Sequence, residues 1–202
     1  TDNCGTVSIS VDEETIPGNA AGNYTIVRSF TATDDSGNAT TLVQTITVED
    51  TTAPELTAPT NYTVECSDTI ILDSATATDN CGEVTVTVSD ETIAGSSAGT
   101  YQISRTHTAT DDAGNSSSSV QIITVIDTTA PVLSIPSDYS VECSDVIVLD
   151  DATATDNCGP ATITLVEQTV AGNASGNYTI VRTFTATDDA ANSSSAVQTI
   201  TV

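Results

Sequence analysis

The pattern of hydrophobic and polar residues along the chain predicts β-strands throughout. The segments 100–110 (TYQISRTHTAT), 118–127 (SSVQIITVID), 62–66 (YTVEC) and 84–90 (VTVTVSD) alternate or are rich in β-branched residues. Because strand side chains point to opposite faces in turn, this alternation is typical of strands with one buried face. Gly- and Ser-rich breaks such as AGSSAG separate the segments, and no helical period extends over even three turns. We therefore expect an all-β fold.

The strand pattern recurs with a fixed period of 77 residues, because the motif TDNCG starts at positions 1, 78 and 155. Proline after small polar residues is extended and is excluded from central strands, so the two DTTAP segments are the natural boundaries. We expect a truncated repeat at 1–49, a complete repeat at 50–126 and a third repeat at 127–202.

Each repeat has the length and the strand pattern of a small β-sandwich. Several short strands with a turn signal every ten or so residues are typical of β-sandwiches. A strand of ten to twelve residues spans roughly 35–40 Å, which sets the length of one repeat. We expect the repeats to be arranged head to tail, with the chain termini at opposite ends.

The charge balance narrows the possible partners. The chain has 28 acidic and 3 basic residues and a formal net charge of -25, which argues against nucleic acid and anionic membranes as partners. No apolar run approaches the roughly 20 residues of a membrane helix, so we expect no membrane insertion in this segment. With 38% hydrophobic residues the chain is not typical of disorder. Because protein cations are so few, a bound metal ion is expected to offset the acidic charge.

The acidic residues concentrate where the ends of strands would meet. In a head-to-tail array, the turn before the last strand, the linker aspartate of the repeat and its TDN loop all lie at one end. Crowded carboxylates repel unless a cation binds, and Ca²⁺ accepts six to eight oxygen ligands in flexible geometry. Asp and Asn are also good turn formers, but three copies at linkers favour calcium. The predicted ligands are Asp50, Asp79, Asp111, Asp112 and Asn115 in the second repeat, Asp127, Asp156, Asp188, Asp189 and Asn192 in the third, and Asp2, Asp34, Asp35 and Asn38 in the first.

One turn position differs between the repeats. Gly37 and Gly114 occupy it in the first two repeats, and Ala191 occupies it in the third. If the position requires a positive φ, alanine costs on the order of 1 kcal/mol. We expect a weaker or reshaped site in the third repeat.

The cysteines predict disulfides rather than a zinc site. Zinc ligation is disfavoured because there is no CxxC motif and His107 is the only histidine. Disulfides fit an oxidising, extracellular setting. The cysteines are Cys4, Cys66, Cys81, Cys143 and Cys158.

Two disulfide pairings are open. The favoured local pairs are Cys66–Cys81 and Cys143–Cys158, which require residues 67–80 to double back, because bridged Cα atoms lie within about 7 Å. In that case the TDN aspartates become the least secure metal ligands. The alternative is Cys66–Cys158, which would lock neighbouring repeats together.

Every arginine of the chain falls at one repeat position, on the more aromatic face of its strand. A buried arginine demands a partner, and the glutamate of the repeated VEC segment is our candidate, Glu142 in the third repeat and Glu65 in the second. The guanidinium could also stack on Tyr178 or Phe184. Fixed spacing on an aromatic face favours a structural role over capture of an anionic glycan. The three residues are Arg28, Arg105 and Arg182.

Nothing in the sequence predicts an enzyme. His107 stands where the other repeats have Phe30 and Phe184, which indicates packing rather than catalysis. No nucleophile motif, catalytic pair of carboxylates or phosphate loop is evident.

The motifs TATDNCG, GNYTIVRTFTATDDAAN and DTTAP resemble those of the HYR (hyalin repeat) family and of HYR-like immunoglobulin-type repeats in large bacterial surface adhesins. The resemblance covers the whole chain. It implies tandem immunoglobulin or fibronectin-III-like β-sandwiches, an extracellular, cell-surface address on a bacterial host, and an adhesive or spacer role. The linkers also resemble those of giant adhesins in which calcium stiffens the joints.

We therefore expect a structural segment of an extracellular adhesin or fibre, made rigid by calcium at the junctions and by disulfides. Its partners would be neighbouring repeats, and surface glycans or other cells. A direct carbohydrate- or protein-binding module is the first alternative, and 3% aromatic residues disfavour it. A self-assembling filament subunit, joined through exposed edge strands, is the second.

Glycosylation is weakly indicated. Sequons arise by chance in Asn-, Ser- and Thr-rich sequence, and in a bacterial host O-linked sugar at DSA (73–75) or DTI (68–70) would fit better. The sequons are at Asn23, Asn38, Asn61, Asn115, Asn173, Asn177 and Asn192.

Overall fold

The structure is a computed structural model that describes residues 5–202, and its regular elements there are all β-strands. Asp2 and Cys4 lie outside the described residues. Within that range, no helix has the length and apolar character needed to cross a membrane. The chain forms two compact units, and their boundary passes through the complete repeat. The first unit holds Thr1–Pro59, Asp73–Ser89 and Arg105–Gln121, and the second holds Thr60–Leu72, Asp90–Ser104 and Ile122–Val202.

The first repeat is an antiparallel sheet of three strands in the order β1-β2-β3. Its long strands follow from the alternating sequence, and the turn between the second and third strands contains Gly37 with a φ of 85°. The strands are β1 (Val7–Pro17), β2 (Tyr24–Asp34) and β3 (Ala39–Val48).

The complete repeat forms a sheet of four strands in the order β5-β9-β8-β7 and a small sheet that pairs β4 with β6. In the larger sheet β5 runs parallel to β9, with Tyr62 opposite Ile123. The strands are β4 (Glu55–Thr57), β5 (Tyr62–Glu65), β6 (Thr76–Thr78), β7 (Val84–Ala94), β8 (Tyr101–Asp111) and β9 (Ser116–Ile126).

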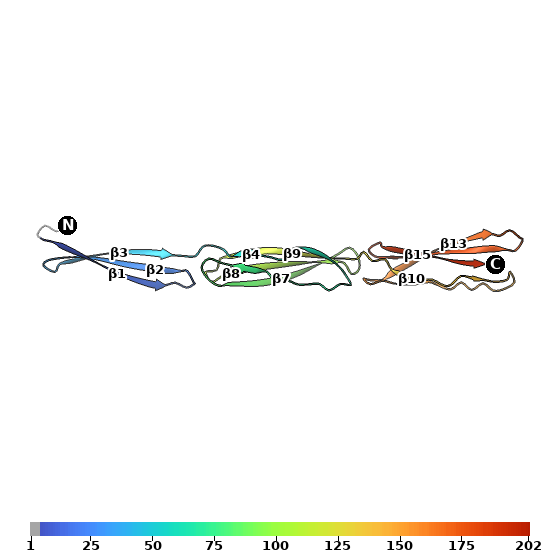
Figure 1. Cartoon of the computed structure of the whole chain (residues 1–202), viewed down its shortest axis with the longest axis horizontal. Coiled ribbons are helices and arrows are strands. Elements are labelled where there is room, and N and C mark those ends of the chain that lie inside the picture. The colour runs from blue at the N-terminus through green and yellow to red at the C-terminus, as the bar shows by residue number, and fades with distance from the viewer. Residues whose placement is uncertain (1–4) are drawn as a thin grey trace. The chain divides into compact units, whose positions relative to one another are not determined.

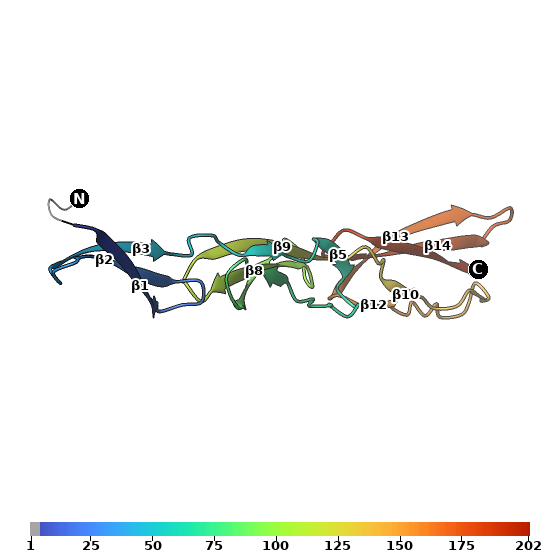
Figure 2. The same ribbon diagram turned by 60° about the vertical axis from the view of Figure 1, so that its left-hand side comes forward.

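The third repeat has the same topology within the second compact unit. Its sheet has the order β11-β15-β14-β13, and the pair β10-β12 forms the opposing layer, as Figures 1 and 2 show. Two layers of antiparallel and parallel strands make each complete repeat a β-sandwich, as the strand pattern predicts. The strands are β10 (Val132–Ser134), β11 (Tyr139–Ser140), β12 (Thr153–Thr155), β13 (Ala161–Ala171), β14 (Tyr178–Asp188) and β15 (Ser193–Thr201).

The direction of the short strands decides where the motifs lie. Because β5 is parallel to β9, both strands run toward the linker that follows residue 126. Because β6 is antiparallel to β4, the chain has turned back by the time it reaches the TDN motif at 78–80. The segment between the two cysteines of a repeat therefore connects its two ends.

The core lies on the inner face of the long strands. In the third repeat Ile180, Phe184, Ala186 and Ile200 are buried, and they share the strand faces that alternation predicts. The outer faces carry Thr and Ser, and hydroxyl pairs such as Thr185 with Ser195, at 2.8 Å, connect neighbouring strands. Because the core is small and contributes little stability, bound ions and covalent links can add substantially to the stability of the fold.

Candidate functional site

Three aspartates meet at the start of the third repeat, and we call this cluster the second joint. Asp127, Asp156 and Asp188 each offer a carboxylate oxygen within 4.8 Å of the others. Asp127 follows β9 directly, Asp156 follows β12, and Asp188 ends β14. The ends of three separate strands therefore bring the carboxylates together, and all three residues lie in the second compact unit.

The same arrangement occurs one repeat earlier, in the first compact unit, and we call it the first joint. There Asp50, Asp79 and Asp111 offer oxygens within 4.8 Å of one another. Each of them lies 77 positions before its counterpart in the second joint. The structure thus brings together, at both joints, the linker, TDN and turn aspartates that the sequence singles out.

One carboxylate oxygen at each joint is buried without a hydrogen-bond partner. Asp79 and Asp156 each use Oδ2 to accept a hydrogen bond from a backbone N–H, that of Cys81 at 2.8 Å and that of Cys158 at 2.9 Å. Their Oδ1 atoms are buried and have no partner among the described residues. A buried, unpaired carboxylate oxygen is costly, and a cation would satisfy it. The donor set, all oxygen, fits Ca²⁺.

Asparagine side chains hold the linkers against the turns. Asn192 donates from its backbone N–H, at 2.9 Å, and from Nδ2, at 3.0 Å, to Asp188, and Nδ2 also reaches the carbonyl of Asp127 at 3.2 Å. Asn115 makes the same contacts with Asp111 and with the carbonyl of Asp50. In this arrangement the N–H groups of the two asparagines position the aspartates of the joints.

Two predicted ligands of the complete repeats, and those of the first repeat, lie apart from the two joints. Asp112 and Asp189 are exposed and belong to neither cluster. In the first repeat Asp34 accepts hydrogen bonds from Asn38, while Asp35 accepts one from the Thr6 hydroxyl. With Asp2 outside the described residues, the proposed site of the first repeat is not assembled by the described part of the chain.

The linker aspartate of the second joint and the turn aspartate of the first joint differ in how readily they ionise. Burial raises the pKa of Asp127, and the neighbouring carboxylates of Asp156, Asp188 and Glu65 raise it further. For Asp111 burial acts to raise the pKa, but hydrogen bonds from Asn115 and from the turn N–H groups lower it below its ordinary value. The linker aspartate thus experiences a repulsion that a bound cation would remove.

The turn of the third repeat keeps its shape despite the alanine. Ala191 has a φ of 70°, close to the 85° of Gly37 and the 92° of Gly114, and it is the one non-glycine residue with positive φ among residues 5–202. Its N–H donates to the Asp188 carbonyl at 3.2 Å, as Gly114 does to Asp111. The turn is thus held in a conformation that alanine disfavours, and a weaker site in the third repeat stays a prediction.

A disulfide joins Cys66 to Cys158, with the Cα atoms 5.8 Å apart. The favoured local pairs, Cys66–Cys81 and Cys143–Cys158, are not those of the structure, in which Cys81 and Cys143 are free. The reason lies in strand direction. Cys66 follows β5 and donates from its backbone N–H to the carbonyl of Ile126 at 2.9 Å, so it sits beside the linker to the next repeat.

The sequence profile of the family described as "HYR-like domain with 4 cysteines" matches two segments of the chain, residues 54–125 and 131–202. The chain belongs to this family. Each matched segment contains two cysteines, and the disulfide connects one HYR-like domain to the other. The profile points to no catalytic family.

Two sea urchin proteins resemble the whole chain. Hyalin of Lytechinus variegatus is 31% identical over 220 residues, and hyalin of Strongylocentrotus purpuratus is 34% identical over 219 residues. All of this chain is covered, but it spans only 41% of the first protein and 18% of the second. Both relatives are sea urchin proteins, so they give no support to the bacterial host that the resemblance to bacterial adhesins implies.

Among solved structures, similar chains include Drosophila N-cadherin EC1-4, with a TM-score of 0.35 and 14% identity, which covers 99% of this chain and 67% of that one. Protocadherin gammaB7 EC3-6 has a TM-score of 0.35 and 15% identity, and covers 98% of this chain and 69% of that one.

Arg182 stacks on an aromatic ring as expected, but its acidic partner differs from the expected one. Arg182 forms an ion pair with Glu167 at 3.4 Å, donates to Gln198 and to the Asp150 carbonyl, and stacks over Phe184 at 4.9 Å. Glu142 is not among these partners. Glu167 lies directly opposite Arg182 on the neighbouring strand, which the sequence alone does not reveal because the register is unknown.

Glu65, the expected partner of Arg105, contacts the linker that leads into the third repeat. Glu65 accepts hydrogen bonds from the N–H and the hydroxyl of Thr128 in the linker, and it lies within 4.8 Å of the Asp127 carboxylate. No local signal in the sequence predicts this contact, because it depends on the parallel pairing that places Glu65 opposite Ile126. Glu65 is thus a further acidic residue at the second joint.

The single histidine is fully buried in its domain. His107 has no exposed surface, and neither ring nitrogen has a hydrogen-bond partner among the described residues. It occupies the core position that Phe184 occupies in the next domain, which agrees with a packing role.

Proposed function

We propose that this chain is a structural segment of an extracellular, cell-surface adhesin or fibre whose junctions are made rigid by Ca²⁺ and by disulfides. Repeats bounded at 1–49, 50–126 and 127–202 would be its mechanical units. Neighbouring repeats are its immediate partners, and surface glycans or other cells are the targets it would help to reach. A bacterial host is the source that the adhesin-like motifs favour.

The observation that carries this proposal is the buried, unpaired Oδ1 of Asp156 in a cluster with Asp127 and Asp188, repeated at Asp79 in the first joint. Turn formation alone would leave such oxygens in solvent or hydrogen-bonded. Two joints with the same unpaired oxygen support a site built for a cation. Because the ligands come from the linker and from two loops, a bound ion would fix the linker to the body of its repeat.

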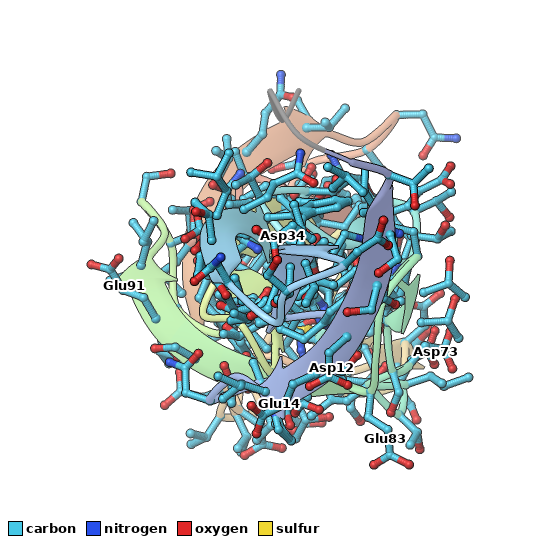
Figure 3. The ribbon with its side chains drawn as sticks, turned by 90° about the vertical axis from the view of Figure 1, so that its left-hand side faces the viewer. Asp12, Glu14, Asp34, Asp73, Glu83 and Glu91 are labelled. Atoms are coloured by element: carbon cyan, nitrogen blue, oxygen red, sulfur yellow. A yellow bond between two sulfur atoms is a disulfide. The ribbon has the colours of Figure 1, made fainter. Side chains whose placement is uncertain are left out.

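Most of the remaining acidic residues do not take part. Figure 3 shows Asp73, Glu83 and Glu91 pointing away from the ribbon, and all three are exposed. The net charge of -25 therefore creates a broad negative field that concentrates cations near the joints. Calcium that binds only the folded state stabilises it by about 2.7 kcal/mol at a free concentration 100 times the dissociation constant.

Calcium titration of the purified chain by isothermal calorimetry tests the proposal. We expect one strong site at each of the two joints, and loss of the second site in Asp156→Asn, which leaves the buried position without its charge. Asp189→Asn is the matched control, because this aspartate is exposed and outside the cluster. Equal effects of the two variants would contradict the assignment of the ligands.

Small-angle scattering with and without EGTA tests the mechanical consequence. Removal of calcium should release the linkers and broaden the distribution of interatomic distances. An unchanged maximum dimension, in a sample shown by calorimetry to bind calcium, would contradict the proposal that the ion stiffens the joint.

A further inference from the structure

The disulfide closes a large covalent loop around the complete repeat. Cys66 and Cys158 are separated by 92 residues, and the loop between them contains β6 to β12 with the linker between the repeats. The three long strands of the complete repeat, β7, β8 and β9, thus all lie inside the loop. Residues up to 65 and from 159 onward lie outside it.

We propose that this bridge is a covalent bypass for mechanical tension. When the chain is pulled from its ends, tension reaches Cys66 soon after entering the complete repeat, crosses the disulfide to Cys158 and continues into the third repeat. The backbone from 67 to 157 carries no net tension, so the long strands of the complete repeat are protected from forced unfolding. The bypass requires only covalent connectivity and operates with or without calcium.

Both ends of the bridge are held at the second joint. Cys66 is tied to the end of β9 by its hydrogen bond to Ile126. On the other side, the backbone N–H of Cys158 donates to Asp156. The tip of the β7–β8 hairpin, at Gly99, lies against Cys158. A methyl group on Gly99, which has a φ of 73°, would come within 2.5 Å of the Cys158 carbonyl oxygen. The bridge therefore runs beside the linker rather than through a mobile loop.

The chemistry of bridge formation is ordinary thiol–disulfide exchange. The thiols of Cys66 and Cys158 lose two protons and two electrons and form one S–S bond. The disulfide of a protein thiol oxidoreductase accepts them and becomes a dithiol. Oxidoreductases of this kind act in the oxidising compartments through which surface proteins pass.

Cys81 has the same surroundings at the first joint as Cys158 has at the second joint. Its sulfur lies 2.8 Å from Nδ2 of Asn80, and the equivalent distance from Asn157 to Cys158 is 3.0 Å. The hairpin tip at Gly22, with a φ of 79°, packs against Cys81 as Gly99 does against Cys158.

In a longer array of these repeats, the same spacing would join Cys81 to the VEC cysteine of the preceding repeat. It would likewise join Cys143 to the TDNC cysteine of the following one. Tension would then follow only the 15 residues between the two cysteines of each repeat. Fully extended, that segment spans about 50 Å, compared with roughly 260 Å for a whole repeat without bridges.

Single-molecule force spectroscopy in EGTA, with the chain held at its two termini, tests the bypass. The bridge shortens the path between the termini by 92 of the 202 residue positions, so about 110 remain to extend. We expect a fully stretched length of about 360–400 Å for the oxidised chain and about 670–730 Å after reduction with dithiothreitol. An oxidised length of about 570–620 Å would indicate the two local pairs, and an unchanged length would indicate no bridge. Either result overturns the proposal.

Matched variants assign the effect to particular cysteines. Cys66→Ser should give the reduced length under oxidising conditions, whereas the double variant Cys81→Ser, Cys143→Ser should keep the short length. Because EGTA is present throughout, failure of the calcium proposal would leave these results unchanged.

Digestion with a Glu-specific protease, without reductant, checks the bridge independently of any pulling. Cleavage after glutamate produces the peptides 66–83 and 143–167, each with two cysteines. The Cys66–Cys158 bridge links them into one species, and local pairs leave them separate and each about 2 Da lighter than its reduced form. Recovery of separate oxidised peptides would refute the proposal even if a variant failed to fold.

Discussion

A single amide group connects the two halves of each joint. Nδ2 of Asn192 reaches both the Asp188 carboxylate and the Asp127 carbonyl, so one side chain joins a turn to a linker 65 positions away in the sequence. The aspartates can then present their remaining oxygens to a cation. At the residue scale the joint is therefore preorganised by neutral hydrogen bonds, and its acidic groups are left free for binding.

The alanine in the turn of the third repeat predicts a simple gain in stability. Ala191→Gly should stabilise the fold by about 1 kcal/mol, because glycine adopts a φ of 70° without strain. Gly114→Ala should destabilise it by a similar amount, since Gly114 has a φ of 92°. Urea unfolding in EGTA, followed by circular dichroism, measures both without the contribution of calcium. Stabilisation by both substitutions would contradict the backbone argument.

The buried histidine predicts a second gain. His107→Phe should raise the free energy of unfolding by about 1–2 kcal/mol, because it removes buried polar atoms that have no hydrogen-bond partner in the described structure. Phenylalanine already fills the equivalent position as Phe184, which is 2% exposed. The reciprocal change, Phe184→His, should destabilise the third repeat. The same denaturation experiment measures both variants, and a loss of stability in His107→Phe would argue for an unseen partner.

At the scale of strands, the register places each of these arginines opposite a glutamate, and burial decides how much the pair stabilises the fold. Arg182 and Glu167 lie opposite each other on β14 and β13, as Arg28 and Glu13 do on β2 and β1. The Arg182 side chain is 3% exposed and the Arg28 side chain is 41% exposed. The same sequence position thus supports a buried network in a complete sandwich and a surface ion pair in the truncated repeat.

Alanine substitution should separate the two cases. Arg182→Ala should cost about 2–4 kcal/mol, because it removes buried packing and leaves Gln198 and the Asp150 carbonyl without their donor. Arg28→Ala should cost about 0–1 kcal/mol, as is usual for an exposed pair. Thermal unfolding of the two variants provides the comparison, and equal costs would show that burial is not the deciding factor.

The sequence predicts the long strands well because alternation is a local signal. The β7–β9 and β13–β15 strands coincide closely with the apolar alternation and the Gly-containing turns. The parallel pairing of β5 with β9 has no local signal, since the partners are about 60 residues apart. The disulfide depends on that pairing, which is why spacing alone favoured the local bridges.

The disulfide pairing also affects how well the sequence predicts the metal ligands. From the sequence, Asp79 and Asp156 are the least secure ligands, because a local disulfide would draw the TDN loop away from the joint. With Cys66 bridged to Cys158, the TDN loop returns to the joint and both aspartates join their clusters. Asp112 and Asp189 point elsewhere, because adjacent residues at the end of a strand face opposite sides.

At the scale of the whole chain, charge repulsion should govern stability when calcium is absent. The net charge of -25 is screened poorly at low ionic strength, where the Debye length is about 30 Å at 0.01 M salt, compared with about 8 Å at 0.15 M. In EGTA we expect the melting temperature to rise by several degrees as sodium chloride increases over this range. In saturating calcium the rise should be smaller, because ions already neutralise the joints. Differential scanning calorimetry measures both, and a larger salt effect with calcium would contradict this account.

Each acidic cluster takes its three aspartates from a single repeat. Asp127, Asp156 and Asp188 all fall between 127 and 202, and Asp50, Asp79 and Asp111 all fall between 50 and 126. Insertion or deletion of one whole 77-residue copy by unequal recombination would therefore leave every remaining site complete. A gene built this way can change the length of its product without the need to evolve a new interface.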